Sequence, residues 1–130
     1  MKILQKFVVI TAWALLSIAS FAFPLKPITM VVPYAPGGST DVLARLLAEA
    51  MARDLGQAVV VENLGGAGGT IGTAKVVRAP NDGHTVLLHN MGIAIAPALY
   101  PKLSFDVTKD LEPITLAGDV PMILVRHPRF

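Results

Sequence analysis

The sequence contains no cysteine. This absence excludes disulfide bonds, zinc sites built on thiolates, and a cysteine nucleophile. It also excludes the lipid-modified cysteine at the start of a bacterial lipoprotein. Any folded domain in the chain must therefore be stabilised by its core alone.

Charged side chains are scarce, at 15% of the residues, and the positive excess lies at the N-terminus. Lys2 and Lys6 account for the whole net charge of +2, because the basic and acidic residues are equal in number after position 22. No cluster of Lys or Arg remains that could follow a phosphate backbone. We therefore expect no nucleic-acid partner.

The first 22 residues have the three parts of a secretory signal peptide. The two lysines precede an uncharged stretch over 7–23, and small residues occupy both positions that a signal peptidase reads, Ser20 and Ala22. An uncleaved membrane anchor is the alternative, but the stretch falls slightly short of the roughly 20 apolar residues that a spanning helix needs. We expect export and cleavage after Ala22.

Apolar runs alternate with helical patterns along the rest of the chain. The first runs are continuously apolar, which is typical of a parallel sheet covered on both faces, so the sequence predicts an α/β fold. We expect strands at 28–32, 58–63 and 85–88, helices at 39–55, 70–78 and 94–99, and extended segments at 114–117 and 122–126.

The first helix has clear start and stop signals. The hydroxyls of Ser39 and Thr40 are suited to its N-cap, and Gly56 is suited to a left-handed C-cap. Helical spacing predicts an apolar face made of Leu43, Leu46, Leu47, Ala50 and Leu55.

Two glycine loops occupy equivalent positions, each between a strand and a helix. They are residues 34–38 and 65–69. In a parallel sheet both loops lie at the carboxyl ends of the strands, where open α/β sheets bind ligands. Backbone N–H groups and helix N-termini there would form an anion cradle suited to a small carboxylate. The alternative is that the glycines only permit tight turns and close packing.

Known nucleotide and hydrolase motifs do not fit these loops. Neither loop has the lysine of a P-loop, and Ile71 stands where a dinucleotide fingerprint needs glycine. The esterase elbow fails at Asp41, although an exported hydrolase with Ser39 as nucleophile stays an alternative. The three histidines lack a metal-ligand spacing, so we expect no metal site.

In these segments the chain resembles the Bug/tripartite tricarboxylate transporter receptor family of bacterial solute receptors. The shared motifs are Pro27 to Asp41, Val60 to Asn63, Gly66 to Gly72, Pro80 to Thr85, Pro97 to Tyr100 and Asp110 to Ile114. They follow one another in order over nearly the whole of residues 23–130.

The resemblance implies a periplasmic receptor with a type II periplasmic binding protein fold, whose two lobes close over a small carboxylate. It implies no enzymatic activity and no cofactor, and a tripartite membrane transporter as partner. Residues 23–130 would form the N-terminal part of the first lobe, with the second lobe absent. The ligand-binding residues implied are Tyr34, Gly37, Gly38, Ser39, Thr40, Asp41, Gly66, Ala67, Gly68, Gly69, Thr70 and Asn90. The alternative is a non-functional truncated remnant of such a receptor.

Overall fold

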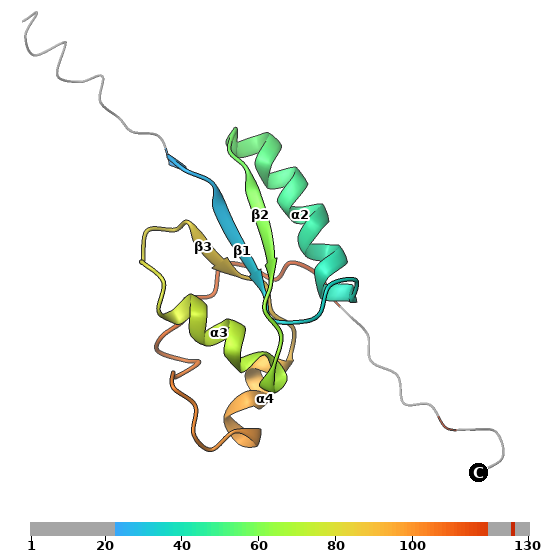
Figure 1. The fold of residues 1–130 in the computed structure, drawn as a ribbon, viewed down its shortest axis with the longest axis vertical. Coiled ribbons are helices and arrows are strands. Elements are labelled where there is room, and N and C mark those ends of the chain that lie inside the picture. The colour runs from blue at the N-terminus through green and yellow to red at the C-terminus, as the bar shows by residue number, and fades with distance from the viewer. Residues whose placement is uncertain (1–22, 120–125, 127–130) are drawn as a thin grey trace, which may run out of the picture.

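The computed structural model describes residues 23–119 and residue 126 (Figure 1). The predicted signal peptide and most of the predicted extended segment at 122–126 lie outside these residues. Three strands and three α-helices follow the expected order, and their bounds agree with the sequence to within two residues. They are β1 Ile28–Val32, α2 Ser39–Leu55, β2 Val59–Asn63, the short 3₁₀ helix η1 Ala67–Gly69, α3 Thr70–Val77, β3 Thr85–Leu87 and α4 Gly92–Leu99.

The strands form a parallel sheet in the order β2-β1-β3, which confirms the predicted α/β class. The most buried strand, β1, is central, and its Met30 pairs with Val61 on one side and Val86 on the other. Because all three strands run the same way, the loops that follow them leave from one edge of the sheet.

Helices α2 and α3 lie on opposite sides of the strands (Figure 1). On the α2 side, Met30, Val32 and Ala44 form the buried core, and Leu47 and Met51 pack against it. The sheet is therefore covered on both faces, as the continuously apolar strands indicated.

The predicted apolar face of α2 was partly wrong. The buried positions are Ala44 and Ala48, whereas Leu46 is 62% exposed. Because Ala44 and Ala48 are four residues apart they share the face toward the sheet, and Leu46, two residues from each, lies on the other side of the helix. Close approach matters more here than the size of the apolar side chains.

The start of α2 also differs from the prediction, while its end agrees. Gly38 is the N-cap, and no side chain caps the helix. Instead the carboxylate of Asp41, in the first turn, reaches back and accepts a 2.8 Å hydrogen bond from the Gly37 amide. The predicted C-cap is confirmed, because Gly56 has a φ of 65° and its amide donates to the Ala52 carbonyl.

Helix α3 packs against the end of β1 through Gly72. A Cβ atom at this position would lie 2.7 Å from the Leu64 carbonyl oxygen and 2.8 Å from the Pro33 Cβ. The next residue, Thr73, is buried, and its hydroxyl donates to the Gly69 carbonyl. Glycine at 72 thus holds the second glycine loop close to the sheet.

After α4 the described chain adds no strand to the sheet. The segment 114–117, which the sequence predicted to be extended, pairs with none of the three strands. Its Ile114 and Leu116 are 81% and 85% exposed. Among the described residues, no helix has the length and hydropathy to cross a bilayer.

We expect Gly72→Ala to destabilise the protein. Alanine favours a helix interior by about 1 kcal/mol over glycine, so only the clash with Leu64 and Pro33 can reverse the sign. Overpacking of this kind costs about 1–3 kcal/mol. Urea unfolding followed by circular dichroism would measure the change.

Gly65→Ala is the matched control, because an added Cβ there would lie 3.6–3.8 Å from atoms of Tyr34 and Ala35, which is ordinary van der Waals contact. Its stability should stay within about 0.5 kcal/mol of the wild type. A Gly72→Ala protein as stable as this control would contradict the close packing of α3.

Candidate ligand-binding site

Three loops meet at the carboxyl edge of the sheet. The chain leaves β1 at 33–38, β2 at 64–69 and β3 at 88–91. The Leu64 amide bonds to the Val32 carbonyl and the Leu88 amide to the Val31 carbonyl, so both later loops start beside the end of β1. The structure therefore brings together the two glycine loops and the segment around Asn90.

The first loop is held by the buried carboxylate of Asp41, which is 3% exposed. Its oxygens accept hydrogen bonds from the Gly37 amide, the Arg45 guanidinium and the Asn63 side-chain amide at 2.8–3.1 Å. Asn63 also donates to the Tyr34 carbonyl and accepts from Arg45. This network ties the end of β2 to both ends of the first loop.

These donors lower the pKa of Asp41 from 3.8 to about 2. The largest cause is the hydrogen bond from Arg45, followed by the bonds from Gly37 and Asn63. Arg45 in turn has its guanidinium turned toward Asp41 and Asn63, so its charge is already paired. The carboxylate predicted as a ligand contact holds the loop in place.

The second loop makes most of its hydrogen bonds within itself. Residues Ala67–Gly69 form the 3₁₀ turn η1, with φ values of 125° at Gly66, 63° at Gly68 and 92° at Gly69. The Gly69 amide donates to Gly66, and both the amide and the hydroxyl of Thr70 donate to Ala67. This loop therefore offers fewer backbone donors than its sequence suggested.

The third loop joins the first through Tyr34. The Tyr34 hydroxyl donates to Asn90 Oδ1 over 2.6 Å and lies 3.2 Å from His89 Nδ1. Asn90 Oδ1 also accepts the Gly92 amide at the start of α4, and the two rings of Tyr34 and His89 meet edge to face. Burial raises the pKa of Tyr34 and lowers that of His89, so it favours the neutral form of both side chains.

Two of the loops at this edge carry donors without a partner among the described residues. The amides of Ser39 and Thr40 begin α2, where helix geometry provides no intrahelical acceptor and no side chain of the described residues caps them. Asn90 Nδ2 has no partner in the described part of the chain, and its Oδ1 is fixed by Gly92. Together with the positive end of the α2 dipole, these groups suit an anion.

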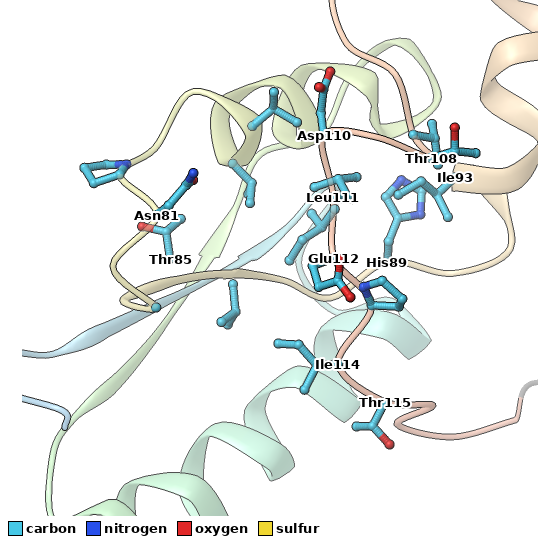
Figure 2. Close-up of a pocket in the computed structure, with 18 residues that line it drawn as sticks. Asn81, Thr85, His89, Ile93, Thr108, Asp110, Leu111, Glu112, Ile114 and Thr115 are labelled. Atoms are coloured by element: carbon cyan, nitrogen blue, oxygen red, sulfur yellow. The ribbon is translucent and has the colours of Figure 1, made fainter.

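A pocket of about 570 Å³ lies elsewhere, between the end of α3, β3 and the segment 107–115 (Figure 2). Its lining contains none of the predicted ligand-binding residues, but it includes His89, whose Nε2 faces Gly69 of the second loop. Asp110 and Glu112 also line it, and two acidic side chains disfavour a carboxylate. We therefore place the candidate anion site at the loops.

Sequence reasoning missed several residues that shape the loops. Asn63 and Arg45 hold Asp41, while Tyr100 lies where a side chain at Gly68 would be, 2.7 Å from an added Cβ. Only the helical spacing of Asp41 and Arg45 could have been found from sequence. The described residues contain no cluster of acidic and histidine side chains fit for a metal.

Comparison with known proteins identifies the fold. A family model described as "Tripartite tricarboxylate transporter family receptor" matches residues 43–130. The chain belongs to this family. The match confirms the resemblance noted from the loop motifs, and the α/β architecture is that of periplasmic binding proteins.

Individual receptors of the family are similar over most of the chain. Protein BugT of Bordetella pertussis is 43% identical over 121 residues, covering 92% of this chain and 37% of its own. The periplasmic binding protein BugD is 52% identical, with a TM-score of 0.68 over 71% of this chain and 31% of its own. MatC from Rhodopseudomonas palustris, solved with bound malate, is 43% identical, with a TM-score of 0.59 over 68% of this chain and 30% of its own. The chain thus spans about a third of the length of its relatives.

We expect acid to destabilise the protein partly through Asp41. The folded pKa of about 2 lies below the usual 3.8, so its contribution is complete above about pH 4 and is lost as the pH falls toward 2. Asp41→Asn should therefore flatten the fall in unfolding free energy over this range. Asp82 and Asp106 also have pKa values of about 2. The unfolding free energy of Asp41→Asn should therefore still fall with pH over this range, but less steeply.

Glu49→Gln is the control for that experiment, because both partners of its ion pair with Arg53 are about 70% exposed. Such a pair is worth about 0–1 kcal/mol, so the acid profile should resemble the wild type. Equal acid profiles for Asp41→Asn and the wild type would show that the carboxylate does not hold the loop.

Proposed function

We propose that this protein is an extracytoplasmic receptor that binds a small carboxylate and delivers it to the membrane subunits of a tripartite transporter. The observation that carries the proposal is the amino end of α2. Its N-cap is a glycine, its first amides lack a side-chain cap, and the Asp41 network fixes the loop that leads into it.

The donors match the chemistry of a carboxylate. Each hydrogen bond from an amide to a charged oxygen contributes about 1.5–3 kcal/mol, and the dipole of α2 adds about 0.3–1 kcal/mol. The amides of Gly38, Ser39 and Thr40 would contact the carboxylate, with Asn90 Nδ2 as a further donor. Tyr34 would form the wall, and Gly37 and residues 66–70 would shape the space beside it.

Asp41 has a different task in this proposal. Its oxygens already accept hydrogen bonds from Gly37, Arg45 and Asn63. Its negative charge would also repel the carboxylate of a ligand. It therefore acts as a positioning residue. The malate bound in MatC supports the carboxylate class, since that relative shares the fold at 43% identity.

The remaining expectations follow from the family. Export and cleavage after Ala22 would place the mature protein in the periplasm, and a second lobe would complete the site. The hydrolase alternative is disfavoured, because the neighbouring carboxylate of Asp41 already accepts hydrogen bonds from Gly37, Arg45 and Asn63. General-base activation of a serine needs an adjacent base that can take its proton.

We expect Ser39→Pro to weaken carboxylate binding by about 10- to 100-fold, the value of one charge-assisted hydrogen bond. Proline removes the amide hydrogen of the first helical residue but suits that position. Gly38 already has the φ of −76° and ψ of 168° that a residue before proline prefers. Isothermal titration of the mature protein, expressed from its complete reading frame, against di- and tricarboxylates would measure the loss.

Ser39→Ala is the matched control, since it removes the hydroxyl and keeps the amide. Its affinity should stay close to the wild type, and an esterase assay on the same pair tests the hydrolase alternative. Equal affinity in Ser39→Pro and Ser39→Ala would remove the α2 amide from the site. No binding by the wild type across the panel would end the carboxylate proposal.

A further inference from the structure

The hydrogen bonds of His89 fix which ring nitrogen carries its proton. Nδ1 lies 2.9 Å from the Asn90 carbonyl oxygen, which can only accept, so Nδ1 must donate. The Tyr34 hydroxyl gives its own proton to Asn90 Oδ1, so its oxygen can accept from the same Nδ1–H at 3.2 Å. In the neutral ring, Nε2 is therefore a bare acceptor.

Nε2 is directed at the second glycine loop. A Cβ atom added at Gly69 would lie 2.8 Å from it, so only glycine at this position leaves the nitrogen uncovered. Gly69 uses its own amide and carbonyl for Gly66 and Thr73. No residue of the described chain donates to Nε2, although the ring is held on its other side by Tyr34 and Asn90.

We propose that His89 determines specificity by accepting, at Nε2, a hydrogen bond from a hydroxyl group of the ligand, so that the site prefers a hydroxycarboxylate to the same acid without the hydroxyl. This inference rests on the proposed carboxylate receptor function. It adds one acceptor to a site that otherwise consists of donors.

The preference for a hydroxycarboxylate arises because Nε2 and a carboxylate oxygen are both hydrogen-bond acceptors. Carboxylate oxygens accept hydrogen bonds and cannot donate to Nε2. A ligand that offers only carboxylates would bring an acceptor beside this nitrogen or leave it without a partner when water is displaced, and both cost affinity. A hydroxyl placed next to a carboxylate satisfies Nε2 while its carboxylate reaches the amides of α2.

Tyr34 connects the two parts of the site. Its backbone carbonyl is held by Asn63 in the Asp41 network, and its hydroxyl belongs to the His89–Asn90 cluster. Tyr34 is therefore the side chain that contacts both the loop leading into α2 and the cluster that holds His89. A hydroxyl at the wrong position along the ligand would not reach Nε2.

Malate and succinate provide the test, because they differ only in one hydroxyl. We expect the wild-type mature protein, expressed from its complete reading frame, to bind one enantiomer of malate at least about tenfold more tightly than succinate, measured by isothermal titration at about pH 8, where the imidazole is neutral.

Two variants distinguish the hydrogen-bond acceptor Nε2 of His89 from a purely structural role of its imidazole ring. His89→Asn places an amide near Nδ1 and deletes Nε2, so the malate-to-succinate ratio should fall to about one. His89→Gln keeps an acceptor near Nε2 and should restore part of the ratio. Thermal melting of each variant checks that it is folded, and the ratio of two ligands in one protein is insensitive to partial unfolding.

The outcomes distinguish this inference from the receptor function beneath it. Equal binding of malate and succinate by the wild type would overturn the role of His89 and leave the carboxylate receptor standing. A preference for malate that survives in folded His89→Asn would also overturn the role of His89 and leave the carboxylate receptor standing. Failure to bind either acid, or any other carboxylate, would overturn both.

Discussion

The buried carboxylate of Asp41 is the constraint on which the candidate ligand-binding edge depends. It lies in the first turn of α2, yet its partners are the loop before the helix and the last residue of the neighbouring strand β2. A serine or threonine N-cap would have satisfied the α2 amides from within and added about 1 kcal/mol of stability. Here glycine takes that position and Asp41 holds the loop from behind, so the helix begins at a fixed place with its amides available.

The three loops at this edge have different tasks, although two of them look alike in sequence. The first loop presents donors. The second has the same glycine-rich composition, but it coils into η1 and uses the amides of Gly69 and Thr70 internally. Its glycines serve close approach, since side chains at 68 and 69 would collide with Tyr100 and His89. The third loop supplies the polar side chains of His89 and Asn90.

The sequence predicted the strands, the helix order and the meeting of the loops because these follow from local patterns. Continuous apolar runs indicate parallel strands, and parallel strands place their following loops at one edge. It predicted the face of α2 only in part, since Leu47 packs against the core but Ala44 and Ala48 are buried in place of Leu46. Hydrophobicity alone ranks leucine above alanine, whereas the distance between helix and sheet decides which one fits.

The contacts of the site depended on register and could not be predicted. Asn63 reaches Asp41 only because it pairs with Val32, at the end of β1, and lies on the α2 side of the sheet. The donor state of His89 depends on Tyr34 and Asn90, which no spacing rule connects. A motif shows which residues are near the edge of the sheet. Their chemical roles follow from which atoms are already bonded there.

Which atoms are already bonded also decides how these loops could discriminate between ligands. Backbone amides recognise any carboxylate, because every carboxylate presents the same oxygens, so selectivity must come from a group of the opposite hydrogen-bonding kind at a fixed separation. Water at an open edge would satisfy such a group equally well and weaken every charge-assisted bond beside it. Discrimination therefore requires the water to be displaced as the ligand binds. The described loops supply the donors on one side of that space, and a second lobe, in the proposed receptor, would supply the enclosure that gives the contacts their full value.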